Sequence, residues 1–488
     1  MKNQFIRFLT VSLISLTLAV LPLGAARDGN LSVEIVIPEA TSLSTGYTYQ
    51  ALQQAMVKDN TDLRKMRQDV TQSLLDVKDA KAGYSPTIDL QISGTYMFNP
   101  PVGPITISTE QIMNGLGVSG IPGMNPNGYV TVYDGMENTM YQFGLSLTQP
   151  LITWGKIGKS VKLYEEVAEV RQLQLTSQQS QLETELETRL ASLWYLDRIR
   201  TMLVEQQGYA ARLVELARQG EANGMLLRQD VLEAQIQAKQ LDITLQEIRE
   251  QFDKLMLGVR KLTNMPDLAW DQISFAPDEA AYLELMAQDY DLLEVQALSP
   301  MQDSLRMLDK LQRVSLYAQD IAEASIYWKP DFALMVDVGY GGSRFPLIEK
   351  DWYRQDSYSA NITIGMKTTI WDGGKKLNDI KRAKSSVESA AVDKDAAMAT
   401  IRQTLREQWL AMQLAQSKIE YQELKISVAQ SKIDQQQKLY DSGYGDESAL
   451  LQAKIEECTA RIELEQQKLT LCNAYYMVKY LSSNPSGL

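Results

Sequence analysis

The chain has 488 residues, with only 15 prolines, two cysteines and no histidine, and its net charge is -13. The excess of 61 acidic over 48 basic residues disfavours binding to a phosphate backbone, so nucleic acid is not an expected partner. Prolines are missing from long tracts such as 157–264, which favours long helices over many small modules.

Catalytic chemistry is not indicated. There is no imidazole to act as a base or ligand, and no nucleophile clusters with a base along the chain. Cys458 and Cys472 would lie roughly 21 Å apart on a helix, too far for a disulfide, and neither has a close partner for a zinc site. We expect both thiols to pack as small apolar groups. The chain is not expected to be an enzyme, and no catalytic, metal-binding or cofactor-binding residue is predicted.

The N-terminus has the order of a secretory signal. Lys2 and Arg7 precede a largely apolar run over 8–23, and small residues follow at 24–26, so we expect a signal peptide over 1–26. No cysteine near this junction could carry a lipid anchor. No later stretch is long and apolar enough for a membrane-spanning helix, so any membrane-embedded part of the mature chain would have to consist of strands.

Two segments, 86–96 and 142–151, alternate apolar and polar residues and are predicted to be strands. The connection over 99–140 between them is rich in Gly, Pro and Asn and is long for a strand loop. From residue 153 the apolar period becomes helical, and a helix over 156–218 would be about 95 Å long.

A glycine-bearing break then predicts a turn and a return helix, so 153–277 is expected to be a helical hairpin with its tip over 218–229. The same order recurs later in the chain. Strands are expected at 330–340 and 361–367, and a hairpin at 372–482 has its tip over 440–448, where Asp446 or Ser448 can cap the return helix.

The stretches QPLITWGKIGK and TIWDGGKKLN mark the strand-to-helix junctions of the two copies, which predicts an internal two-fold repeat. We expect the first break to carry four extra residues between Gly220 and Ala234, so that the two tips differ in shape. The junction residues singled out are Pro150, Gly155, Gly373 and Gly374.

Strands of about ten residues with aromatic ends fit a tilted bilayer-spanning strand, and the alternative is a surface strand of a soluble sandwich. Four such strands cannot close a barrel alone, and a lone hairpin of this length leaves an apolar stripe uncovered, so several copies are expected to associate. The aromatic residues at the loop-side ends are Tyr96, Phe98, Tyr141, Tyr340, Phe345, Trp352, Tyr353 and Tyr358.

Over nearly the whole mature chain the sequence resembles the TolC-type outer membrane efflux protein family. The resemblance rests on the strand entries GYSPTIDL and WKPDFAL, the two junctions above, and the hairpin breaks followed by DVLEAQ and LLQAK. It implies a mixed α and β fold dominated by long antiparallel helical hairpins that form an α-barrel. In a homotrimer, four transmembrane strands per chain would make a shared twelve-stranded β-barrel.

The resemblance also implies a division of the chain. The expected parts are a signal peptide at 1–26, an N-terminal segment with an equatorial helix at 27–85, a first strand pair at 86–152 with an extracellular loop at 99–140, a first periplasmic hairpin at 153–277, equatorial helices at 278–329, a second strand pair at 330–371, a second hairpin at 372–482 and a tail at 483–488. The loop over 99–140 would be either a lid over the barrel or a disordered segment.

By the same resemblance the chain is expected in the outer membrane, as the exit duct of a tripartite efflux pump or a type I secretion system. Its partners would be a periplasmic adaptor (membrane fusion) protein, an inner-membrane transporter and outer membrane lipid. The alternative is a soluble periplasmic coiled-coil scaffold or adaptor. The cargo cannot be inferred from the sequence.

Three groups of residues are candidates for this function. Polar strand residues would line the barrel lumen: Asp89, Gln91, Ser93, Gln142, Ser146, Asp337, Asn361 and Lys367. Hairpin tips would dock the adaptor: Gly220, Gly224, Met225, Leu226, Gly443, Tyr444 and Gly445. Relatives carry an aspartate pair after the second-hairpin glycine, where this chain has Ala449 and Gln452, so the periplasmic gate candidates are other acids: Asp230, Glu233, Asp446 and Glu447.

Overall fold

The computed structural model describes residues 46–119, 125, 127–342 and 358–482. Several sequence predictions fall outside these residues: the signal peptide at 1–26, the stretch that follows it up to 45, the tail at 483–488, and the aromatic residues Phe345, Trp352 and Tyr353.

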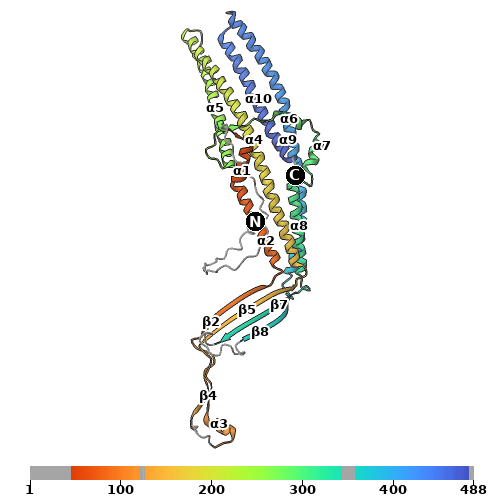
Figure 1. Cartoon of the computed structure of the whole chain (residues 1–488). Coiled ribbons are helices and arrows are strands. Elements are labelled where there is room, and N and C mark those ends of the chain that lie inside the picture. The colour runs from red at the N-terminus through yellow and green to blue at the C-terminus, as the bar shows by residue number, and fades with distance from the viewer. Residues whose placement is uncertain (1–45, 120–124, 126, 343–357, 483–488) are drawn as a thin grey trace. The chain divides into compact units, whose positions relative to one another are not determined.

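Two pairs of long helices dominate the described residues (Figure 1). Helices α4 (Lys156–Ala222) and α9 (Lys375–Asp441) have 67 residues each, and α5 (Arg228–Thr263) and α10 (Glu447–Ser482) have 36 each. None of the four contains proline, which would remove a backbone donor and break the helix. The prediction of a mostly helical fold with some sheet is confirmed.

The shorter helices pack against these hairpins. Their bounds are Tyr49–Asp59 (α1), Thr61–Ala82 (α2), Glu279–Met286 (α6), Tyr290–Ala297 (α7) and Asp303–Ala324 (α8), and a 3-10 turn spans Trp270–Gln272. The expectation of one equatorial helix before residue 85 is wrong, because Asn60 separates α1 from α2. The Asn60 side chain accepts hydrogen bonds from the N–H groups of Asp62 (2.9 Å) and Leu63 (3.2 Å), and it donates to the carbonyl of Leu262.

Four strands form one antiparallel sheet in the order β2 (Thr87–Tyr96), β5 (Thr139–Ile152), β7 (Asp331–Gly342) and β8 (Tyr358–Lys367). The pairing places apolar residues opposite one another across all four strands. One such row is Ile88, Leu147, Val336 and Ile362. Since side chains alternate between faces along each strand, one face of this sheet is apolar and the other is polar.

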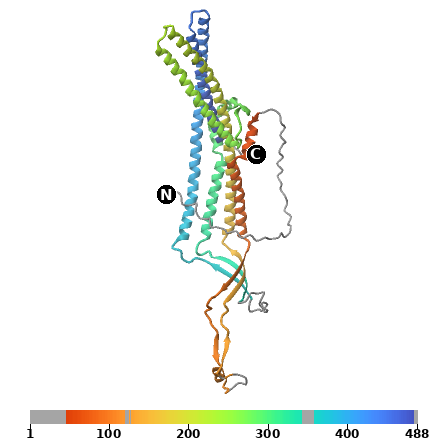
Figure 2. The ribbon, with the colours of Figure 1, turned by 90° about the vertical axis from the view of Figure 1, so that its left-hand side faces the viewer.

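The described part of the connection between β2 and β5 contains regular elements, which were not predicted from the sequence. It contains a two-stranded ribbon of β3 (Ile105–Ser108) and β4 (Tyr129–Tyr133) with helix α3 (Thr109–Leu116) between them. The Ser108 hydroxyl caps α3 by accepting a hydrogen bond from the N–H of Gln111, and Gly117 ends the helix with a left-handed φ of 65°. Figure 2 shows the ribbon continuing from the loop-side end of the sheet.

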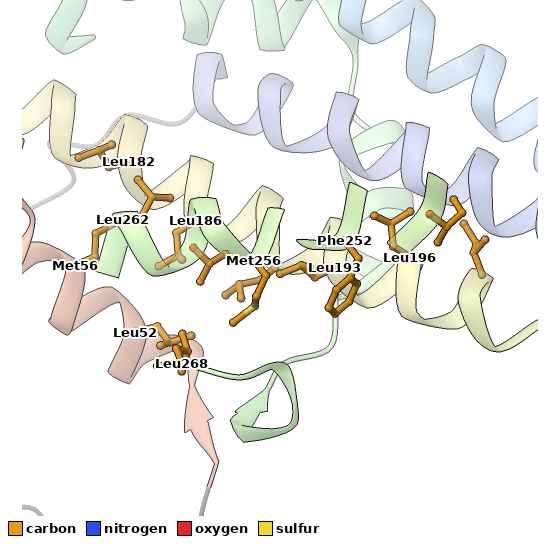
Figure 3. Close-up of a cluster of buried hydrophobic side chains, with 14 of the residues drawn as sticks. Leu52, Met56, Leu182, Leu186, Leu193, Leu196, Phe252, Met256, Leu262 and Leu268 are labelled. Carbon is orange, nitrogen blue, oxygen red and sulfur yellow. The ribbon is translucent and has the colours of Figure 1, made fainter. Parts of the chain in front are cut away.

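Two apolar clusters hold the hairpins and short helices together. The first joins α1, α4 and α5 through residues such as Met56, Leu193 and Phe252 (Figure 3). The second joins α6, α9 and α10 around Trp409 and Cys472. Burial of each large side chain contributes about 1.5–3 kcal/mol, so these clusters stabilise the middle of the hairpins.

Both cysteines are free and buried, as predicted. A two-stranded parallel pair, β1 (Tyr47–Thr48) with β6 (Ile273–Ser274), lies at the edge of the first cluster. No helix among the described residues is both long and apolar enough to cross a membrane.

Candidate functional site

The polar face of the four-stranded sheet gathers the residues predicted to line a lumen. Strand register aligns Asp89, Ser146, Asp337 and Asn361 in one row across all four strands. Because residues two apart share a face, the other four candidates belong to the same face: Gln91, Ser93, Gln142 and Lys367. This face therefore carries the sheet's carboxylates and three of its four amides, all but that of Gln149.

The opposite face is apolar and uncovered in the single chain. Ile362 on edge strand β8 is 78% exposed, and Ile88 and Leu90 on edge strand β2 are exposed as well. The outer edges of β2 and β8 have no strand partner among the described residues. An exposed apolar face and unpaired strand edges are surfaces on which a sheet can associate with an apolar partner or with another strand.

Glycine geometry shapes the junctions between strands and helices. Gly155 (φ 78°) and Gly374 (φ 84°) stand at the N-termini of α4 and α9 in the left-handed region, and Gly373 has a φ of 68°. The other predicted junction residue, Pro150, lies inside β5 at a bulge in its pairing with β7. A bulge tolerates proline because the local ladder is already interrupted.

Hydrogen bonds tie the four helix–strand connections to one another. The Gln149 amide donates to the carbonyl of Tyr84 at 2.9 Å, and the Trp154 indole N–H donates to the carbonyl of Pro330 at 2.7 Å. The Tyr327 hydroxyl donates to the Asp372 carboxylate, which also accepts the N–H of Gly374 at 3.1 Å. The bonds from Gln149, Trp154 and Tyr327 join residues distant in sequence and connect the end of the sheet to the helices.

The two hairpin tips have the same length. Each turn has five residues, at 223–227 and 442–446, between helices of equal size. The expected four extra residues in the first tip are therefore absent. The first helix continues through Gly220 to Ala222, four residues beyond its predicted end.

Hydrogen bonding in the two turns is also equivalent. The carbonyl of Gly220 accepts the N–H groups of Met225 (2.8 Å) and Leu226 (3.2 Å). In the second tip the carbonyl of Leu439 does the same for the residues at 444 and 445, at 3.0 and 2.9 Å. The left-handed residue in each turn is a glycine, Gly224 with φ 68° and Gly443 with φ 76°.

Six of the seven predicted docking residues lie on these turns, and the seventh, Gly220, lies near the end of α4. Met225 is 80% exposed and Tyr444, at the equivalent position of the second tip, is 89% exposed. Leu226 instead covers Gly220, where an added Cβ would meet its side chain at 2.7 Å. Gly445 approaches backbone atoms of the preceding helix equally closely.

The gate candidates fall into two structural groups. Equal turn lengths make Asp230 equivalent to Ala449 and Glu233 equivalent to Gln452, so the first hairpin holds acids where the second has neutral residues. The Asp230 carboxylate accepts the N–H of Leu227 at 2.8 Å, which closes the first tip.

The acids of the second tip have different roles. Asp446 accepts a hydrogen bond from the Ser448 hydroxyl, within the turn. Glu447 reaches the other hairpin, where it accepts from Arg212 at 2.8 and 3.0 Å. This hydrogen-bonded ion pair lowers the pKa of Glu447 below its usual range. The sequence offered no sign that Arg212 would be its partner.

The seam between the hairpins, α4 against α10, also contains polar contacts further from the tips. The Gln206 amide donates to the Thr459 hydroxyl at 2.8 Å, and Arg198 pairs with Glu465 at 2.9 Å. Glu465 is buried and its Oε2 has no hydrogen-bond partner, and burial raises the pKa of this carboxyl. Among the described residues no group of three His, Cys, Asp or Glu side chains could hold a metal ion.

Comparison with known proteins agrees with this geometry. The family model described as outer membrane efflux protein matches residues 51–264 and 302–476. The fold is similar to the outer membrane protein VceC of Vibrio cholerae, with 14% identity, a TM-score of 0.67, and coverage of 89% of this chain and 96% of that chain.

The CmeC outer membrane channel of Campylobacter jejuni is likewise similar, with 12% identity and a TM-score of 0.69 over 90% of this chain and 86% of that chain. The open state of the MtrE outer membrane channel of Neisseria gonorrhoeae has 14% identity and a TM-score of 0.63, covering 89% of each chain. At these identities the likeness concerns the fold alone. None of the curated proteins matches the sequence.

Proposed function

The chain belongs to the outer membrane efflux protein family, and from that premise we propose that three copies form the exit duct of a tripartite efflux pump or a type I secretion system. Its relatives are outer membrane channels that work with pumps. In the proposed assembly each copy contributes four strands to a shared twelve-stranded barrel and two hairpins to a periplasmic tube.

The observation that carries the proposal is the two-faced sheet with open edges. Its apolar face, including Ile88 and Ile362, is suited to lipid, and its polar face, including Asp89 and Asp337, is suited to a water-filled lumen. Pairing of β8 with β2 of a neighbouring copy would satisfy both edges and close the barrel.

The lateral helices support association along the tube. α5 and α9 lie on opposite outer sides of the two-hairpin array, and each keeps an exposed apolar stripe at helical spacing. The stripe on α5 consists of Leu232, Ile236 and Ile243, and that on α9 consists of Leu410, Leu414, Tyr421, Leu424 and Val428. Packing of α5 from one copy on α9 of the next would bury both stripes.

The tips are proposed to dock a periplasmic adaptor through Met225 and Tyr444, and to be gated by the nearby acids. In a trimer Asp230 and Glu233 would recur three times around the axis, and a ring of carboxylates favours cations. The tie between Arg212 and Glu447 would hold the two hairpins of each copy together at this level. The matched helix lengths of the two halves support the proposed internal repeat.

The test uses paired substitutions on one strand. Ile362→Arg with Ile364→Arg alters the apolar face of β8, and Asn361→Arg with Thr363→Arg alters its polar face. A charge at the bilayer midplane costs about 2–4 kcal/mol on a lipid-exposed face, so only the first pair should abolish outer membrane insertion and heat-labile trimer bands.

Conductance of the detergent-extracted protein in planar bilayers is the second measurement. Release of the unaltered full-length chain by osmotic shock, dissolved without detergent as a monomer, would reject the duct. It would instead support the alternative, a soluble periplasmic scaffold or adaptor.

A further inference from the structure

Each of the four helix–strand connections carries an exposed aromatic ring with a lysine within four residues. The pairs are Lys81 with Tyr84, Trp154 with Lys156, Trp328 with Lys329, and Trp371 with Lys375. We name this set the junction collar. No such pairing exists at the loop-side end of β2 and β5, because residues 86–152 contain no lysine or arginine at all. For β2 and β5, therefore, the pairing of an aromatic ring with a lysine marks only the helix-side end.

The strongest part of the collar lies where α8 meets β7 and β8 meets α9. Trp371 is 81% exposed and Trp328 is 70% exposed, although large aromatic side chains are usually well covered. The connections that carry them are joined by the Tyr327–Asp372 hydrogen bond and by one from the Thr368 hydroxyl to the carbonyl of Tyr327 at 2.7 Å. These hydrogen bonds thus fix the two connections from which the exposed indoles project.

Three lysines and one acid, Asp372, lie beside these two indoles. Lys375 is exposed, and its ammonium group pairs with no acid among the described residues. The Lys329 ammonium group donates to the carbonyl of Glu323 at 3.4 Å and likewise pairs with no acid there. Lys376 lies over the ring of Tyr327, with its Nζ 5.2 Å from the centroid. The Asp372 carboxylate accepts hydrogen bonds from Tyr327 and from the N–H groups of Gly374 and Lys376. Its negative charge offsets one of the three lysines, so the group remains net positive.

The collar follows directly on the apolar face of the sheet. Ile364 and Met366 on β8 are exposed, and the collar begins within a few residues of them. In the proposed duct this places the indoles and lysines at the depth where hydrocarbon gives way to headgroups. Indole rings favour that depth, and lysines there attract anionic phosphate.

We propose that Trp328, Trp371, Lys329, Lys375 and Lys376 form a binding surface for the phosphate groups of anionic phospholipids in the helix-side leaflet. The inference rests on the proposed membrane insertion and adds a lipid preference to it. The indoles anchor the chain at the interface irrespective of headgroup, whereas the lysines select negative charge.

The experiment is a lipid titration of the purified full-length protein followed by native mass spectrometry. Phosphatidylglycerol and phosphatidylethanolamine are the probes, and inorganic phosphate is the competitor. We expect the unaltered protein to prefer phosphatidylglycerol. Combined Lys329→Gln, Lys375→Gln and Lys376→Gln should weaken phosphatidylglycerol binding roughly tenfold and leave phosphatidylethanolamine unchanged. Combined Trp328→Ala and Trp371→Ala should weaken both lipids.

The matched control replaces three lysines of α9 away from the sheet, Lys418→Gln, Lys425→Gln and Lys432→Gln, and should change neither lipid. Equal binding of both lipids by the unaltered protein would overturn the inference even if the lysine variant failed to assemble. So would displacement by inorganic phosphate alone. Normal conductance without a lipid preference rejects only the proposed lipid-binding surface. Absence of both conductance and trimers rejects the proposed duct function itself.

Discussion

The two hairpins share one backbone plan but distribute their charge differently. Both have helices of 67 and 36 residues and a five-residue turn with a left-handed glycine. At equivalent positions, however, the first has Asp230 and Glu233 where the second has Ala449 and Gln452. The comparison teaches that turn geometry depends on glycine and length, while the acids near the tips vary independently of the backbone.

The largest expected effects come from substitutions in the two apolar clusters, which consist of different residues. Leu193→Ala in the first cluster and Leu405→Ala in the second remove fully buried side chains, and each should destabilise the chain by about 2–5 kcal/mol. Urea unfolding followed by circular dichroism measures both. Two separate transitions in one variant would mean that the halves unfold independently.

Glycine substitutions sharpen the comparison of the turns. Gly224→Ala and Gly443→Ala both force a side chain into the left-handed region and should cost a similar amount, about 1–2 kcal/mol. Gly445→Ala should cost more than Gly220→Ala, because its Cβ would meet backbone atoms and not a leucine side chain. Thermal unfolding of the four variants gives the ranking, and equal losses at positions 220 and 445 would contradict it.

Exchanging the acids near the two tips tests whether they set the ion selectivity of the pore. Asp230→Ala with Glu233→Gln makes the first tip resemble the second and should lower the cation preference of the pore. Ala449→Asp with Gln452→Glu should raise it. The reversal potential in a salt gradient across a planar bilayer measures the preference, and unchanged potentials in both double variants would remove these acids from the gate.

The smallest effect concerns the exposed tie between the hairpins. The folded-state pKa of Glu447 is lowered from its ordinary value of 4.5. The stabilisation by its ion pair with Arg212 is therefore present above pH 4.5 and is lost as the pH falls through the folded-state pKa. Arg212→Gln should remove this dependence. Distances between spin labels at positions 225 and 444 should lengthen in acid for the native tie only, and a pH-independent distance would refute the role of Glu447.

Much of the fold was predictable because it depends on local periodicity. Alternation along 86–96 and 361–367 gave the correct faces of β2 and β8, and helical spacing identified the long hairpins. The helix break at Asn60 was missed, since its cap depends partly on a carbonyl of α5 more than 200 residues away. The ribbon within 99–140 was missed because its strands have only four and five residues and the rest of the connection is rich in Gly, Pro and Asn.

The sequence by itself determined the strand faces, the presence and order of the two hairpins and the family to which the chain belongs. The tertiary structure alone decided which acids pair across the hairpins, as with Arg212 and Glu447, and which connections brace the sheet end, as with Tyr327 and Asp372. The physical reason is the distance along the chain over which each kind of signal acts. Periodicity reports the environment of one segment, whereas an ion pair or hydrogen bond between distant segments requires their packing to be known.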